Sequence, residues 1–140
     1  MDEQSVTLSH DEGIPVITFV ILHPTYCIVK LSLKAPDTNN WVQVLETDNR
    51  AQSAFEISFD DPASFPDGNP VGNDVQDFDG WRLGWVVFFD GHSTTAVDPY
   101  AITIGMRQGQ NAVMHPEFKK QGDFDGPAKV FNGYVKFKVV

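Results

Sequence analysis

The chain has 140 residues, of which 41% are hydrophobic and 21% are charged, and its formal net charge is −9. Disordered chains combine low hydrophobicity with high charge, so this composition excludes general disorder. The chain holds only 10 lysines and arginines, which excludes the basic face of a nucleic-acid-binding protein, and its one cysteine, Cys27, excludes an internal disulfide.

The first half of the chain predicts four strands. Residues 14–22 are apolar and β-branched and end before Pro24, whereas residues 26–34 alternate apolar and polar side chains with a period of two. The short connection between these two segments predicts a hairpin. Alternating segments at residues 41–46 and 55–59 predict two further strands.

The second half begins with a long acidic loop, residues 60–80, whose length makes disorder an alternative to packed structure. Residues 81–89 form the strongest strand pattern. Both faces of this segment are apolar, so we expect a central strand covered on both sides. Alternation continues at residues 100–106 and 130–140, and residues 111–121 predict a short strand or a helical turn.

Seven or eight short strands separated by Gly, Pro, Asn and Asp turns predict an all-β fold, an antiparallel two-sheet β-sandwich. A closed β-barrel is the alternative. No linker divides the chain, so residues 1–140 are predicted to form one domain. The acidic start lacks the features of a signal peptide, and no apolar stretch is long enough to cross a bilayer. We expect no transmembrane segment, and a protein that is cytoplasmic or released by a non-classical route.

An Asp-Phe-Asp-Gly sequence occurs twice in the second half of the chain. Calcium takes six to eight oxygen ligands, many of them carboxylates. The paired aspartates Asp77, Asp79, Asp123 and Asp125 are therefore candidate calcium ligands, although their spacing does not match an EF-hand loop. The alternative is that these residues only form turns, because aspartate side chains hydrogen bond to the local backbone.

Aromatic residues at expected strand ends provide a second candidate site. A sugar ring stacks its apolar face on an aromatic ring, while amides and carboxylates bind its hydroxyl groups. Core packing is the alternative use of aromatic residues, and it is the one expected for Trp85 in the middle of a strand. The candidate ligand-binding residues are Trp41 beside Asn39 and Asn40, Trp81 beside the acidic loop, and Tyr100 after a proline; Tyr134, after Asn132–Gly133, has similar neighbours.

No motif points to catalysis. The four histidines, His10, His23, His92 and His115, are scattered, and neither zinc-ligand spacing nor a nucleophile motif occurs. Cys27 lies in an apolar segment and is expected to be a small buried core residue. We therefore expect a protein that is not an enzyme, and assign no catalytic residue.

The sequence favours a non-catalytic binding module for a glycan or protein ligand, with a glycan as first choice and calcium as a bridge. The expected site is the loop at residues 60–81. The alternative is a structural or self-assembling protein, such as a viral or phage component. Acidic residues crowd residues 56–79, and five lysines lie within residues 119–138, so charged patches or edge strands could join subunits into a homo-oligomer.

In size, acidity and β pattern the chain resembles small lectins without signal sequences, aegerolysin-like proteins, and viral or phage structural domains. The resemblance is one of composition and carries no residue role.

Overall fold

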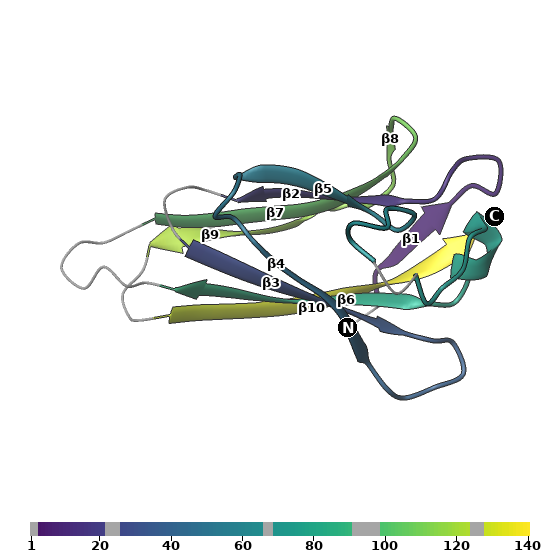
Figure 1. Cartoon of the computed structure of the whole chain (residues 1–140), viewed down its shortest axis with the longest axis horizontal. Helices are drawn as coiled ribbons and strands as arrows, with labels where there is room; N and C mark the ends of the chain where they lie inside the picture. Colours follow the sequence, from purple (N-terminus) through teal and green to yellow (C-terminus); the bar gives the residue numbers. More distant parts are fainter. Residues whose placement is uncertain (1–2, 22–25, 66–68, 91–98, 124–127) are drawn as a thin grey trace.

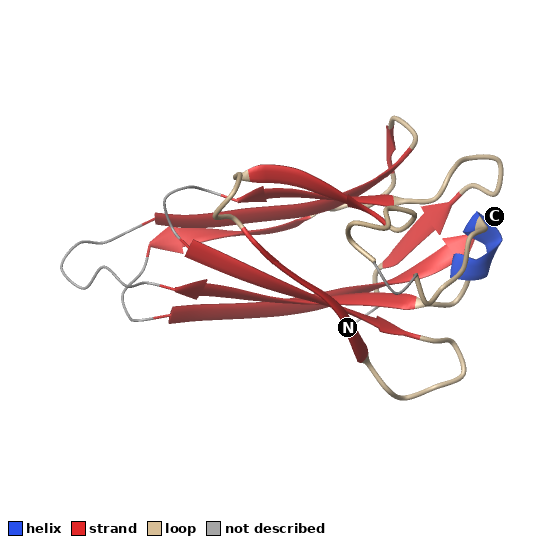
Figure 2. Ribbon diagram, viewed as in Figure 1, coloured by secondary structure: helices blue, strands red, loops and turns tan. Residues whose placement is uncertain are grey.

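The computed structural model describes residues 3–21, 26–65, 69–90, 99–123 and 128–140. Strands in these segments lie in two layers (Figure 1). The helix coloured blue in Figure 2 is a short 3-10 helix, and none of the described residues is in an α-helix. The layers are two five-stranded sheets that do not close into a barrel. The predicted all-β sandwich is therefore confirmed, and the barrel alternative is wrong.

Sheet A has the strand order β1-β10-β6-β3-β4. Its strands are β1 (Ser5–Leu8), β3 (Tyr26–Lys34), β4 (Val42–Asp48), β6 (Arg82–Asp90) and β10 (Ala128–Val139). Sheet B has the order β5-β2-β7-β8, with β9 also paired to β7. Its strands are β2 (Val16–Ile21), β5 (Ala54–Ser58), β7 (Pro99–Gln108), β8 (Asn111–Ala112) and β9 (Phe118–Asp123). The pair of β1 and β10 is parallel, whereas the other described pairs are antiparallel.

The core lies between the two sheets and is built from alternate side chains of the long strands. In β3 the inward residues are Cys27, Val29, Leu31 and Leu33, all of which are buried. Trp85 in β6 is only 4% exposed, as predicted for a core residue. A strand whose side chains alternate in this way can bury one face and leave the other in solvent.

The hairpin predicted between residues 14–22 and 26–34 is wrong. β2 pairs with β5 and β7 in sheet B, whereas β3 pairs with β4 and β6 in sheet A. Both strands carry a strongly apolar face, and placing them in opposite sheets lets the two faces pack against each other across the core.

β6 is central in sheet A, between β10 and β3, as predicted. On its outer face Gly84 is buried beneath the ring of Trp41, whereas Val86 is 42% exposed. The expected cover on both sides is therefore only partial. β1, which the sequence pattern did not predict, covers the edge of β10 only along Lys136–Val139.

The acidic loop is packed structure in the part that is described. It contains a 3-10 helix, η1 (Val75–Phe78), whose first turn is held by a capping box between Asp74 and Asp77. Gly80, which follows η1, has a φ of +84°, the left-handed region that favours glycine. Four loop side chains are buried at this end of the sandwich: Phe65, Val71, Val75 and Phe78.

Candidate functional site

A hollow of about 680 Å³ lies on the outer face of sheet A, which points away from sheet B. Residues of β3, β6 and β10 line it, together with Trp41 from the segment before β4 and Glu3 from the segment before β1. This volume falls within the range of about 300–1,000 Å³ that is typical of small-molecule sites. The hollow is therefore the main candidate for a binding site in the described part of the chain.

An aromatic pair forms the apolar wall of the hollow. Gly84 in β6 has no side chain, and the ring of Trp41 occupies the space above it, so that a Cβ on Gly84 would lie only 2.9 Å from Trp41 Cζ3. Tyr134 in β10 is the cross-strand partner of Gly84. The rings of Trp41 and Tyr134 therefore meet edge to face, with their centroids 5.9 Å apart. Both remain accessible, with exposed fractions of 43% and 46%.

Neutral hydrogen-bonding groups stand beside the aromatic pair. Asn132 lies two residues before Tyr134 on β10, so both side chains project from the same face, and Asn132 is exposed. Ser32 on β3 is opposite Gly84 and is partly exposed. An amide and a hydroxyl group offer both donors and acceptors to a polar ligand that covers the rings.

An ion pair lies at one end of the hollow. Arg82 donates from Nε to Glu3 Oε2 at 2.6 Å and from Nη2 to Glu3 Oε1 at 3.3 Å. The hydrogen bond from Arg82 is the main reason why the pKa of Glu3 lies below its usual value, and the positive charges of Arg82, Lys136 and Lys34 lower the pKa further. Both lysines therefore lie close enough to Glu3 to act on its charge.

The structure separates the ligand-binding residues predicted from sequence. Trp41 lines the hollow, and the exposed Asn39 and Asn40 lie just before it but not in its lining. Trp81 is partly buried against the core beside η1, and its backbone amide donates to the carbonyl of Phe78. Tyr100 packs on Phe89 and Phe131 between the sheets and is likewise outside the hollow.

Two kinds of site residue were not predicted from sequence. Glu3, Lys34 and Arg82 belong to segments that the sequence places far apart, and only the strand register brings them together. Their one local signal is the alternation of β3, which puts Lys34 on the polar face of that strand. Tyr134 and Asn132 had the expected neighbours in sequence, but nothing there linked them to Trp41.

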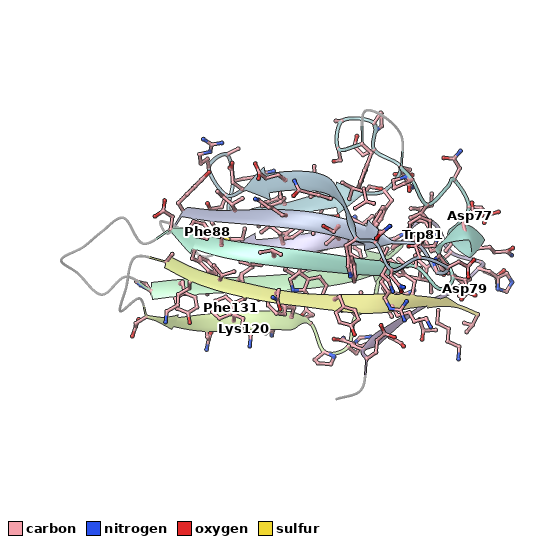
Figure 3. All side chains as sticks on the ribbon, turned by 90° about the horizontal axis from the view of Figure 1, so that it is seen from below. Asp77, Asp79, Trp81, Phe88, Lys120 and Phe131 are labelled. Atoms are coloured by element: carbon pink, nitrogen blue, oxygen red, sulfur yellow. The ribbon has the colours of Figure 1, made fainter. Side chains whose placement is uncertain are left out.

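The three candidate calcium ligands that lie in the described residues do not come together. Asp77 and Asp79 lie beside η1 and Trp81 at one end of the domain (Figure 3), whereas β9 ends with Asp123 at the other end (Figure 1). β10, which runs between these ends, has 12 residues and spans roughly 36 Å at about 3.3 Å per residue. Asp125 lies outside the described residues.

The aspartates near η1 bind backbone groups. Asp77 Oδ2 accepts from the amide of Asp74 at 3.2 Å, and Asp79 Oδ1 accepts from the amide of Val139 at 2.9 Å. Within the described ranges, no group of three or more His, Cys, Asp or Glu side chains could hold a metal ion. These contacts support the turn-forming interpretation of Asp77 and Asp79.

The cysteine and the described histidines are tied to local structure. Cys27 is fully buried, and burial, with a smaller contribution from the charge of Asp48, raises the pKa of its thiol to about 12. His10 lies 3.1 Å from Asp11, and His115 lies 3.0 Å from the carbonyl of Ala112; both are exposed. His23 and His92 lie outside the described residues.

Comparison with known proteins adds no homologue: no protein-family model, curated protein or solved structure matches the chain. The described residues include no helix with the length and apolar character needed to cross a membrane. The geometry of the hollow therefore has to carry the functional interpretation.

Proposed function

We propose that the protein is a non-catalytic glycan-binding module and that its site is the hollow on the outer face of sheet A. The observation that carries the proposal is the half-exposed pair of Trp41 and Tyr134 at the wall of this hollow. Burial is the commonest use of aromatic side chains. Two aromatic rings held accessible beside polar groups are the arrangement that a sugar requires.

A sugar has apolar C–H groups and polar hydroxyl groups, which match the aromatic pair and the hydrogen-bonding groups of the hollow. The C–H groups on one face of a pyranose ring pack on the faces or edges of Trp41 and Tyr134, and the hydroxyl groups at the ring edge reach Asn132 and Ser32. Tyr134, Asn132 and Ser32 lie on strands of one sheet, which hold their backbones in fixed register, so less conformational entropy is lost when the ligand binds. The proposal uses Trp41 from the sequence-based prediction, but replaces the acidic loop with the sheet face and uses no calcium bridge.

The proposal is tested by titrating a panel of soluble oligosaccharides while following tryptophan fluorescence, with calorimetry on any ligand that shifts the emission. Trp41→Ala should weaken binding at least about 5-fold, because central aromatic residues contribute more than about 1 kcal/mol to an interface. Tyr134→Ala should also weaken binding. Tyr26→Ala is the matched control, because Tyr26 is an aromatic residue of β3 that does not line the hollow.

Two results would contradict the proposal. One is the absence of any saccharide binding up to millimolar concentration. The other is binding that Trp41→Ala leaves unchanged while Tyr26→Ala weakens it.

Self-assembly is the second candidate function, and one observation favours it. An apolar row formed by Val130, Phe88 and Ile28 crosses three neighbouring strands on the outer face of sheet A. Val130 is 58% exposed, and no described element covers the row. A second surface seated on this row would bury it. Sedimentation across a hundredfold range of concentration tests this function, and a constant monomer mass would count against it.

A further inference from the structure

Three basic residues form a row across three neighbouring strands of sheet A. Lys136 on β10 is the cross-strand partner of Arg82 on β6, and Arg82 is the partner of Lys34 on β3. Cross-strand partners on one face have their Cβ atoms about 4.5–5.5 Å apart, so the three positive charges project side by side. Tyr134 and Gly84 are the next outward residues of β10 and β6, so the row borders the aromatic pair. Lys34 and Arg82 line the hollow, and Lys136 lies next to Arg82 just outside the lining.

This row is an exception in an acidic protein. The whole chain carries 19 Asp and Glu against 10 Lys and Arg, yet Glu3 is the one carboxylate among the residues that line the hollow. Glu3 is engaged with Arg82, and neither Lys34 nor Lys136 forms an ion pair with any residue in the described ranges. Like charges placed side by side across strands are destabilising. Glu3 supplies one negative charge against the three positive charges of the row, so a second carboxylate would offset more of their mutual repulsion.

We infer that the glycan bound in the hollow is an acidic saccharide whose carboxylate lies against Lys34, Arg82 and Lys136. This inference rests on the proposed function and specifies the class of sugar. Glu3 already shows that a carboxylate fits the Arg82 guanidinium, through Nε and Nη2. The guanidinium has five N–H donors, so others stay available for a second carboxylate, and the two lysines add their charges.

The position of the row beside the aromatic wall defines how such a sugar lies. Its ring packs on Trp41 and Tyr134, and its carboxylate projects along β10 and β6 toward Lys136 and Arg82. The overall negative charge disfavours long polyanions at a distance. A short oligosaccharide with a spaced carboxylate therefore suits the site better than a densely charged polymer.

The test uses oligosaccharides of galacturonate, glucuronate and sialic acid, each paired with its neutral methyl ester. Binding is measured by calorimetry with the full chain at low and high salt. For at least one pair the free acid should bind more tightly than the ester. Raising the salt concentration should weaken binding of the acid and leave binding of the ester unchanged, because exposed charge pairs are screened.

Variants then assign the effect to the row. Lys34→Gln and Lys136→Gln should each weaken binding of the acid by roughly 1.5- to 5-fold, the contribution of one exposed charge pair, and should weaken binding of the ester less than binding of the acid. Glu3→Gln should strengthen binding of the acid, because it removes the carboxylate that pairs with the Arg82 guanidinium. Lys119→Gln is the matched control, because Lys119 is an exposed lysine on β9 of sheet B, outside the hollow.

The outcomes separate the two proposals. If acid and ester bind equally well and both depend on Trp41, the acidic-sugar inference is overturned and the glycan module stands. If no oligosaccharide binds, or if binding does not depend on Trp41, the glycan module itself fails and the inference fails with it. If Lys119→Gln weakens binding of the acid as much as Lys34→Gln does, the effect belongs to net charge and the row has no special role.

Discussion

Adding one methyl group to each of two glycines in sheet A should have unequal consequences for stability. A Cβ on Gly84 would lie 2.9 Å from Trp41 Cζ3, and a Cβ on Gly133 would lie 2.8 Å from Trp85 Cζ2. Ordinary carbon–carbon contacts are about 3.5–4.0 Å, so each ring would have to move by roughly 0.6 Å or more. The two rings differ in their freedom to do so, because Trp41 is 43% exposed and Trp85 only 4%.

The exposed ring can move into solvent, whereas the buried ring cannot. Trp85 is packed against Phe118, with ring centroids 5.2 Å apart. Overpacking of a core costs about 1–3 kcal/mol. Replacing glycine by alanine also lowers the entropy of the unfolded chain, which stabilises the fold by about 0.4–1 kcal/mol. Gly84→Ala should therefore change the free energy of unfolding by less than about 1 kcal/mol, whereas Gly133→Ala should lower it by about 1–2 kcal/mol.

Urea unfolding followed by far-ultraviolet circular dichroism measures both free energies without relying on tryptophan emission. Thermal unfolding provides a second measure, since 1 kcal/mol corresponds to about 3–5 °C for a domain of this size. Gly84→Ala should also shift tryptophan emission and weaken any ligand that packs on Trp41. Equal destabilisation by the two variants would show that Trp41 is held as rigidly as Trp85, and would refute this reasoning.

Three further predictions concern Cys27, the pair of Glu3 and Arg82, and Asp79. Because burial raises the pKa of Cys27 to about 12, Ellman's reagent should react with the native protein at pH 8 only through unfolding. The unfolded thiol ionises near pH 8.5, so the free energy of unfolding should fall as the pH rises above that value. A double-mutant cycle of Glu3→Gln and Arg82→Gln should give a coupling of about 1 kcal/mol at neutral pH. Because Arg82 lowers the pKa of Glu3, this coupling should persist above the pKa of an unfolded glutamate and disappear as the pH falls below the lowered value. Asp79→Ala removes the acceptor of the Val139 amide and should lower the free energy of unfolding by about 1 kcal/mol, equally in EDTA and in millimolar calcium.

Each of these predictions has a clear contrary result. Rapid labelling of Cys27 in the folded protein would show that the thiol is accessible. A coupling free energy of zero between Glu3 and Arg82 would show that this ion pair does not contribute to stability. A rise of several degrees in the unfolding temperature with calcium, lost in Asp79→Ala, would support the metal site after all.

The amino-acid sequence by itself determines the long core strands of this protein, but not β1, β8 or β9. The alternation from Tyr26 to Lys34 gives the bounds of β3, because a half-buried strand must place every second side chain in the core. The same reasoning identifies β6, the buried state of Trp85 and the inaccessible Cys27. These properties follow from local period and composition, which act over a few residues.

Only the tertiary structure decides which strands are neighbours, and the candidate site depends on that choice. β2 and β3 are close in sequence but lie in opposite sheets, where their apolar faces share one core. Trp41 meets Tyr134 because Gly84 leaves room for its ring. Strand register aligns distant parts of the chain, and the sequence carries no local signal of register because it is fixed by packing of the whole core.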